Sequence, residues 1–226
     1  MEVTYSMNKI VIAVDGPAGA GKSTVAKKIA DKLNILYIDT GAMYRAVTLN
    51  IIKNNIDLKD DESIQRLLEN IEITLKGEKI YLNQKDVSKK IRSTEVNRLV
   101  SPVSAMPIVR EKLVKLQRDM ASLNSVIMDG RDIGTNVLKN ADVKIYLTAS
   151  IDERAKRRYL EMKEKGIAAD LDLDAVKKDI IMRDKIDSER TLNPLKKAED
   201  AIIVETTDKS IDEVVNEIID IVNKEI

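Results

Sequence analysis

The chain has 226 residues, enough to bury the core of one large domain. Lysine and arginine together number 38, and aspartate and glutamate also number 38, so the formal net charge is zero. This balance argues against a broad basic surface for nucleic acid or for a membrane. Cysteine and histidine are both absent, which excludes disulfides, thiolate metal sites and histidine general bases.

The first seven residues, MEVTYSM, contain no basic segment followed by a long apolar core. No apolar run in the chain reaches the ~18 residues that a membrane-spanning helix needs. We therefore expect a cytoplasmic protein whose first residues form a tail, with Met7 as an alternative start to Met1.

A glycine-rich turn over residues 16–24 follows the apolar run 10–14 and precedes apolar residues at helical spacing. A continuous apolar run is typical of a parallel strand that is buried on both faces. The turn fits the spacing G-x-x-x-x-G-K-[ST], in which backbone amides surround phosphates, the lysine reaches the β/γ-phosphates and the hydroxyl binds Mg²⁺. A helix N-terminus adds free N–H groups and a partial positive charge. The predicted phosphate-binding residues are Gly16, Pro17, Ala18, Gly19, Ala20, Gly21, Lys22, Ser23 and Thr24. The alternative is a glycine-rich turn with an incidental lysine.

Two further strand ends carry polar and charged residues. A strand over 35–38 is followed by a polar turn over 39–45 and a helix over 46–52, and a strand over 125–128 ends in Asp-Gly-Arg-Asp. In an open parallel sheet, such turns meet at the carboxyl ends of the strands, where ligands bind. Thr40, Arg45 and Arg131 are therefore expected to face one crevice. The alternatives are a solvated helix residue for Arg45 and a local Asp–Arg pair in the later turn.

The middle of the chain interrupts this strand and helix rhythm. A charged helical pattern over 57–70 precedes two alternating segments, 71–75 and 79–82, which indicate a hairpin. We therefore predict an inserted subdomain at about 60–105, with 89–92 and 101–104 on its inner surface or in its connections. Pro107 suits the first turn of a helix that carries Arg110 early and a buried stripe of Val109, Leu113, Leu116 and Met120.

The last third of the chain predicts a strand over 143–147 and a helix that begins with a capping box at Ser150 and Glu153. Arg154, Arg157 and Arg158 share one flank of this helix, which Gly166 interrupts. This flank either binds an anion or pairs with acidic neighbours, Glu153 and Glu161. A further helix leads into residues 183–190, and a strand over 201–204 precedes a terminal amphipathic helix that is capped at Ser210.

The segments GPAGAGKST, DTGAMYR, DGRDIGT, ERAKRR and RDKIDSER occur in this order, and through them the chain resembles the bacterial cytidylate kinases from about residue 8 to 225. The resemblance implies an α/β P-loop kinase core, with a five-stranded parallel sheet flanked by helices. It also implies a small inserted antiparallel monophosphate-binding subdomain and a helical lid at about 153–170. Residues 1–226 would form one kinase domain that transfers the γ-phosphoryl group of Mg-ATP to CMP or dCMP.

The resemblance also implies roles for single residues. Catalytic roles fall on Lys22, Arg131, Arg157 and Arg158, the last two as lid arginines, and Ser23 would bind Mg²⁺. Thr40, Arg45 and Arg131 would hold the acceptor phosphate. The cytosine would be read by Ser101, Arg110, Asp132 and Arg190, and the ribose by Arg183 and Asp187. Thr40 and Lys185 stand where some relatives have Ser and Arg.

The chemistry of these side chains suits the implied reaction. Phosphoryl transfer depends on positioning and charge stabilisation, so it can proceed without histidine or cysteine. A carboxylate can accept from the cytosine N4 amine while guanidinium groups donate to N3 and O2. We expect a monomer with nucleotides as its partners. The alternatives are a P-loop kinase for another nucleoside monophosphate or small metabolite, and a nucleotide-dependent switch, for which the guanine-reading motif Asn-Lys-x-Asp is missing.

Overall fold

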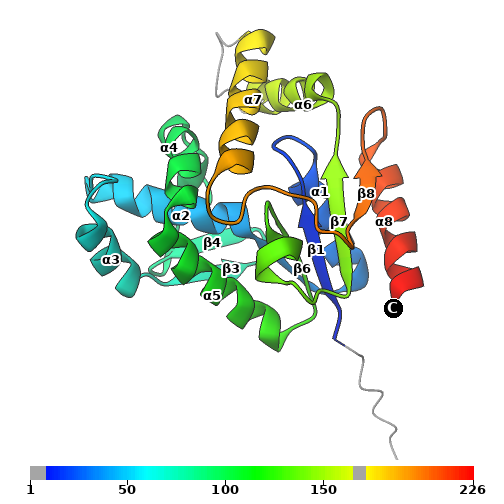
Figure 1. Ribbon diagram of the computed structural model, residues 1–226, viewed down its shortest axis with the longest axis horizontal. Coiled ribbons are helices and arrows are strands. Elements are labelled where there is room, and N and C mark those ends of the chain that lie inside the picture. Colours follow the sequence, from blue (N-terminus) through cyan, green and yellow to red (C-terminus); the bar gives the residue numbers. More distant parts are fainter. Residues whose placement is uncertain (1–8, 165–171) are drawn as a thin grey trace, which may run out of the picture.

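The computed structural model describes residues 9–164 and 172–226 of the chain. The expected N-terminal tail and the distal part of the expected lid, with Gly166, lie outside these residues. A parallel sheet in the order β2-β6-β1-β7-β8 forms the centre of the molecule (Figure 1). Its strands are β1 (Val11–Asp15), β2 (Leu36–Asp39), β6 (Val126–Gly130), β7 (Val143–Thr148) and β8 (Ile202–Glu205).

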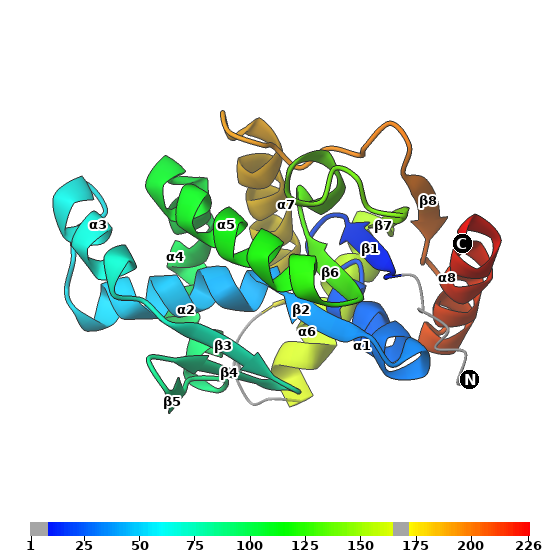
Figure 2. The same ribbon diagram turned by 90° about the horizontal axis from the view of Figure 1, so that it is seen from below.

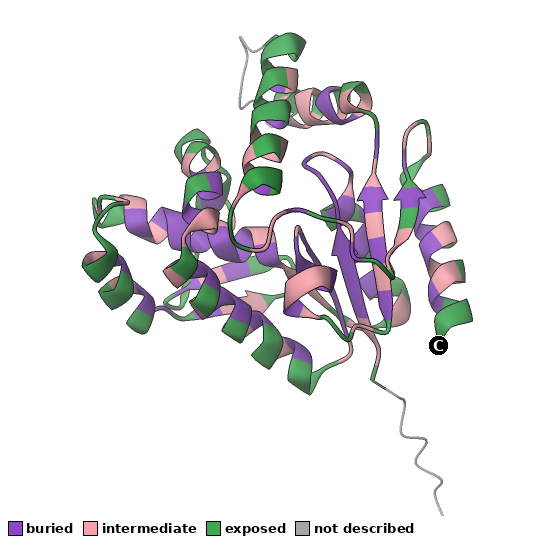
Figure 3. Ribbon diagram, viewed as in Figure 1, coloured by how far each residue is buried: buried purple, intermediate pink, exposed green. Residues whose placement is uncertain are grey.

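The two faces of the sheet bury different residues because side chains alternate along a strand. On one face, Ile12 and Val14 pack with α1 (Lys22–Leu33) and α8 (Ile211–Glu225). On the other face, Ala13 belongs to a core with α2 (Thr40–Lys53) and α5 (Pro107–Leu123). Figure 3 shows that the central strands are mostly buried, whereas the surrounding helices also have exposed residues. The continuous apolar runs in the sequence therefore reflect burial on both sides.

An inserted unit extends this second core. It contains α3 (Asp61–Glu69), β3 (Ile73–Lys76), β4 (Lys79–Leu82), β5 (Lys85–Asp86), the short helix η1 (Lys90–Arg92) and α4 (Thr94–Ala105). The three strands form an antiparallel sheet, which lies alongside α2 in Figure 2. Their tight turn uses Gly77 at a φ of 56°, a conformation that glycine adopts without steric cost. Apolar residues of the insertion and of α2 and α5 form one cluster, so the insertion is packed onto the main body.

Two helices stand above the carboxyl ends of the strands in Figure 1. They are α6 (Ile151–Glu164) and α7 (Leu173–Glu189). A π-helical turn, η2 (Ile133–Val137), follows β6. Within the described residues, no helix is both long and apolar enough to cross a membrane.

The structure confirms the expected strands of both sheets to within two residues and adds β5. Residues 101–104, expected on the inner surface of the insertion or in its connections, are part of α4, where Ser101 and Val103 are buried and Pro102 lies inside the helix. Two local predictions were wrong. Helix α2 begins at Thr40, not at 46, because Asp39 caps it by accepting from the Ala42 N–H (2.7 Å). The capping box of α6 is only half formed: Ser150 accepts from the Glu153 N–H (3.2 Å), but the Glu153 carboxylate accepts from Arg157 (2.7 Å).

Candidate active site

The carboxyl ends of the parallel strands place the glycine-rich loop beside two acidic turns. In the strand register, Asp15 lies opposite Gly130, and Asp39 lies opposite Asp129. The loop leaves β1 through Gly16, where an added Cβ would lie 2.0 Å from the Leu147 carbonyl oxygen. Only glycine therefore allows the chain to turn here. The loop ends at Gly21, the N-cap of α1, so Lys22, Ser23 and Thr24 form the first turn of the helix.

Lys22, at the first position of α1, is buried and folds back onto its own loop. Its Nζ donates to the Pro17 carbonyl oxygen (2.7 Å). Burial is the largest cause that lowers the pKa of Lys22 well below its usual value, and Arg131 lowers it further. A phosphate group in the loop would remove this cost, because it would supply the missing counter-charge.

Asp129 is a site residue that the sequence analysis did not single out. One of its carboxylate oxygens accepts from the Ser23 hydroxyl (2.8 Å) and the other from the Tyr37 hydroxyl (3.0 Å). Burial, followed by the charge of Asp39, raises its pKa to about 6. Its position after a strand next to β1 is the signal that could have identified it, because P-loop proteins hold Mg²⁺ with the loop hydroxyl and such an aspartate.

The oxygen ligands of Ser23 and Asp129 fit Mg²⁺, which prefers hard oxygen donors and is commonly held by few protein groups plus substrate phosphates. Among the described residues, no group of three or more carboxylate, histidine or cysteine side chains is arranged to hold a metal. A magnesium ion here would therefore depend on the nucleotide phosphates for its remaining ligands.

Three arginines from different elements gather next to the loop: Arg45 from α2, Arg131 from the turn after β6 and Arg183 from α7. Burial is the largest cause that lowers the pKa of Arg45 to about 9, and the charge of Arg183 is the next. For Arg183, burial followed by the charge of Arg131 lowers the pKa to about 10. The Nε atoms of Arg45 and Arg183 are buried without a hydrogen-bond partner. Buried donors with mutual repulsion favour an anion at this position.

Arg131 is held in place by Asp187 of α7, whose carboxylate accepts from its Nε (2.8 Å). Burial alone would raise the pKa of Asp187, but Arg131 and Arg183 outweigh it and the pKa is lowered. Asp187, which the resemblance assigned to the ribose, is therefore charged and paired with Arg131, which the resemblance assigned to the acceptor phosphate.

A second buried cluster consists of Arg110 from α5, Asp132 and Arg190, the residue that ends α7. Asp132 is paired with Arg110, and it accepts from Arg190 (2.8 Å). The three side chains are only 4%, 6% and 5% exposed, respectively. Asn136, another residue that the sequence analysis missed, donates to the same carboxylate (3.0 Å).

The remaining predicted acceptor-site residues lie around these clusters. The Thr40 hydroxyl donates to the Asp129 carbonyl oxygen (2.7 Å). Ser101 is buried on α4, and the Arg110 guanidinium donates to the carbonyl oxygen of Ser104, one turn further along (3.3 Å). Hydrogen bonds and ion pairs thus join two groups of the predicted acceptor-site residues: Arg131 with Asp187, and Arg110 with Asp132 and Arg190.

The arginines of α6 have acidic partners in this structure. Arg157 pairs with Glu153 (2.7 Å), and Arg158 pairs with Glu161 (2.9 Å), which is the salt-bridged alternative. Arg157 also donates to the Thr206 hydroxyl (2.8 Å), and it lies beside Gly21 of the loop. Arg158 lies close enough to Arg183 to lower its pKa.

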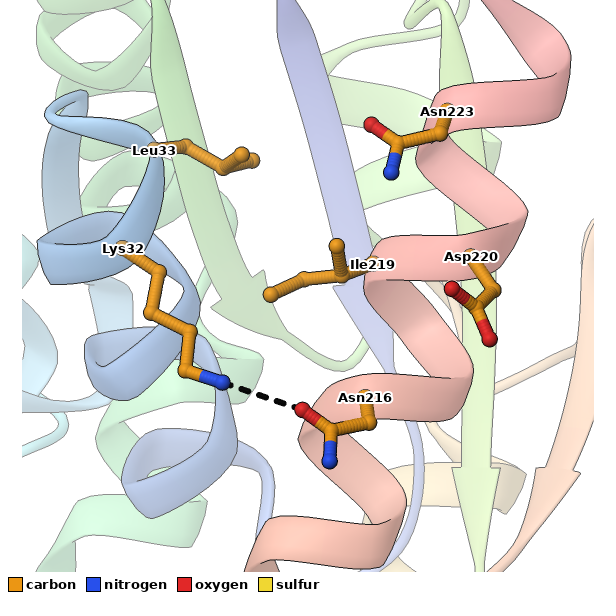
Figure 4. Close-up of a pocket in the computed structure, with 6 residues that line it drawn as sticks. All are labelled: Lys32, Leu33, Asn216, Ile219, Asp220 and Asn223. Carbon is orange, nitrogen blue, oxygen red and sulfur yellow. Dashed lines mark hydrogen bonds between the residues drawn. The ribbon is translucent and has the colours of Figure 1, made fainter.

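A shallow groove elsewhere on the surface lies between α1 and α8 (Figure 4). Its lining includes Lys32 and Leu33, at the opposite end of α1 from the loop, and Asn216, which accepts from Lys32 (3.0 Å). The groove is therefore separate from the candidate active site.

A parallel sheet in this order, with the phosphate loop after β1 and an arginine-lined crevice beside it, defines an α/β protein of the P-loop kinase class. A solved structure of an uncharacterized protein from Eubacterium ventriosum shares the fold, with a TM-score of 0.54, 17% identity and coverage of 96% of this chain and 99% of that chain. Residues 12–224 match the family model described as Cytidylate kinase. The chain therefore belongs to the cytidylate kinase family, as the resemblance predicted.

Curated relatives support this assignment over nearly the full length. A protein named Cytidylate kinase from Alkaliphilus oremlandii is 55% identical over 215 residues, which cover 95% of this chain and 98% of the relative. Another of the same name from a Geobacillus species is 53% identical and covers 97% and 99%, respectively.

Proposed function

We propose that this protein transfers the γ-phosphoryl group of Mg-ATP to CMP or dCMP, giving ADP and CDP or dCDP. One observation carries the proposal. The turn after β6 bears both Arg131, in the arginine cluster beside Lys22, and Asp132, in the buried cluster with Arg110 and Arg190. The two residues that would bind the phosphate and the base of the acceptor are thus adjacent on one turn. Family membership supports the same reading.

On the donor side, the amides of residues 16–24 would bind the ATP phosphates, and Lys22 would leave the Pro17 carbonyl to neutralise the transferred group. Ser23 and Asp129 would hold Mg²⁺, which supplies charge stabilisation to the β- and γ-phosphates when bound.

On the acceptor side, Arg45, Arg131 and Arg183 would bind the α-phosphate of the monophosphate, with Thr40 beside them. The unpaired Nε donors of Arg45 and Arg183 are available for its oxygens. By holding the acceptor phosphate, these arginines would position its oxygen for attack on the donor, and such positioning supplies much of the catalysis in phosphoryl transfer.

The base would be read by Asp132, Arg110, Arg190 and Ser101. Cytosine presents an N4 donor beside the N3 and O2 acceptors, a pattern that one carboxylate and two guanidinium groups can satisfy. Uracil reverses the pattern at N3 and C4, so a buried polar group would be left unpaired. Such a mismatch discriminates by about 1–3 kcal/mol.

The proposal includes one kinase domain over residues 1–226, with the insertion at about 60–105 binding the monophosphate. It also includes a lid at about 153–170 that carries Arg157 and Arg158. The position of α6 beside the phosphate loop supports this part of the proposal. The cytoplasmic location and the monomeric state stay predictions.

An acceptor panel tests the proposal. In an ATP-coupled assay, kcat/KM should be much higher with CMP or dCMP than with UMP, AMP or GMP. Comparable rates with AMP would contradict it and favour a kinase for another acceptor. Binding of ATP without phosphorylation of any acceptor would favour a nucleotide-dependent switch.

A further inference from the structure

Ala18, near the middle of the phosphate loop, is held from outside by two charged side chains. Its N–H donates to one carboxylate oxygen of Asp184 (2.9 Å), and its carbonyl oxygen accepts from Arg154 Nη1 (3.0 Å). Arg154 and Asp184 also pair with each other, and Arg154 Nε donates to the carbonyl oxygen of Ala149 (3.0 Å). Both backbone polar groups of one loop residue are therefore satisfied by α6 and α7.

The side chain of Ala18 makes a second, apolar connection to the same two helices. It packs in a small cluster with Ala155 of α6 and with Val176 and Ile180 of α7, separate from the two larger cores. The next residue, Gly19, is equally close: an added Cβ would lie 3.0 Å from the Arg154 carbonyl oxygen. This part of the loop thus packs on the α6–α7 pair rather than on the sheet.

We propose that Arg154 and Asp184 are positioning residues that hold the phosphate loop in a fixed place relative to the acceptor helix α7. Asp184 directly follows Arg183 and lies about one helical turn before Asp187, which holds Arg131 (2.8 Å). The helix that places two acceptor-site arginines therefore also places Ala18. This inference rests on the proposed function, because it assigns a donor site to the loop and an acceptor site to α7.

A purely stabilising role fits this pair less well. A partly buried ion pair loses much of its Coulomb energy to the desolvation of both charges, so it is a weak source of net stability. Its hydrogen bonds, however, are charge-assisted and directional, and they go to the backbone of the loop that would bind the donor. The expected contribution is therefore to the geometry of the loop and so to the binding of ATP.

Equilibrium binding separates the two roles. The probe for the donor site is AMP-PNP with Mg²⁺, and the probe for the acceptor site is CMP, each titrated alone by calorimetry. Asp184→Ala should weaken AMP-PNP binding about tenfold or more, the loss expected for one charge-assisted hydrogen bond. CMP binding should change less than threefold. Steady-state kinetics should show the same split, with a larger rise in KM for ATP than for CMP.

Three further variants complete the design. Asp184→Asn keeps an oxygen that can accept from the Ala18 N–H, so it should bind AMP-PNP more tightly than Asp184→Ala does. If Asp184→Ala does not fold, the same binding measurements are made on Asp184→Asn instead. Arg154→Ala combined with Asp184→Ala should lose less affinity than the sum of the single losses, because the side chains act as a pair. Asp179→Ala, an exposed position on the same helix, is the control and should bind both probes like the wild type.

Unchanged AMP-PNP affinity in a folded Asp184 variant would overturn the inference, as would an equal loss of affinity for both probes. The acceptor panel on the wild type is independent of this result. A wild type that binds AMP-PNP but phosphorylates a different acceptor would refute the proposed substrate and leave the binding test of Asp184 interpretable.

Discussion

The Ser23 hydroxyl donates a 2.8 Å hydrogen bond to the Asp129 carboxylate and so joins the phosphate loop to the end of strand β6. The two residues are 106 positions apart in the sequence. They meet because β1 and β6 are neighbours in the parallel sheet. A hydroxyl and a carboxylate at this distance offer two oxygen donors close together, and oxygen donors are the ligands that a magnesium ion prefers.

Asp129→Asn should lower kcat by about a hundredfold and raise the Mg²⁺ concentration needed for half-maximal rate, since the amide removes the charge that would face the proposed cation. Initial rates over a magnesium titration would measure both effects. Asp31→Asn, an exposed position on α1, is the matched control. An unchanged magnesium dependence in the Asp129 variant would show that this carboxylate does not serve the metal.

Lys22→Ala should reduce kcat by about 10²–10³, the usual cost of removing one preorganised group that stabilises transition-state charge. The fold should persist, because burial and the nearby Arg131 already disfavour the Lys22 charge and its removal relieves that cost. Coupled-assay kinetics and a thermal melt test the two parts. Lys32→Ala, at the exposed far end of the same helix, should retain wild-type turnover, and retained turnover in Lys22→Ala would refute the phosphate-loop assignment.

Asp132→Asn should lower kcat/KM for CMP by about 10–100-fold and reduce the preference for CMP over UMP, because an amide can serve as donor or acceptor at the base. The same change leaves Arg110 and Arg190 without their shared carboxylate, so we expect a loss of about 3 kcal/mol in the free energy of unfolding. Urea denaturation measures this loss. Asp119→Asn, exposed on α5, serves as the control, and an unaltered CMP to UMP ratio in the Asp132 variant would argue against base reading by this residue.

Asp15 should make the stability of the protein depend on pH. Burial raises its pKa from 3.8 to about 6, although the Ile133 and Gly134 N–H groups oppose this by donating to it (2.8 Å each). Since the folded state then binds the proton more tightly, this contribution is complete below the unfolded pKa of 3.8 and is lost as pH rises through about 6.

Asp15→Asn lacks this titration. The stability of the wild type minus that of the variant should therefore fall by up to about 3 kcal/mol between roughly pH 4 and pH 7. Urea denaturation of both proteins across this range gives the difference directly. A difference that is constant with pH, or one that grows, would contradict the raised pKa.

Local sequence patterns were enough to predict several features of the fold. Neighbouring residues were enough to predict the glycines and Lys22 of the phosphate loop, the apolar runs of the parallel strands and the hairpin at Gly77. This is possible because backbone conformation and burial on both faces each restrict the residue types over a few consecutive positions. The strand ends also predicted that Thr40, Arg45 and Arg131 face one crevice, but the roles of the acceptor-site residues came from the family resemblance. Local reasoning alone allowed Arg45 to be a solvated helix residue.

The charged groups that meet in the folded protein come from distant parts of the sequence, and local patterns did not predict their pairing. Asp184 reaches Ala18 across 166 positions, Asp129 reaches Ser23 across 106, and Asp15 reaches Gly134 across 119. A charged residue at the end of a strand or helix looks the same in the sequence whether it faces water or a buried partner. The order of strands in the sheet and the packing of α7 over the loop decide which groups lie next to each charged side chain. These neighbours set the protonation state and the hydrogen bonds of that side chain.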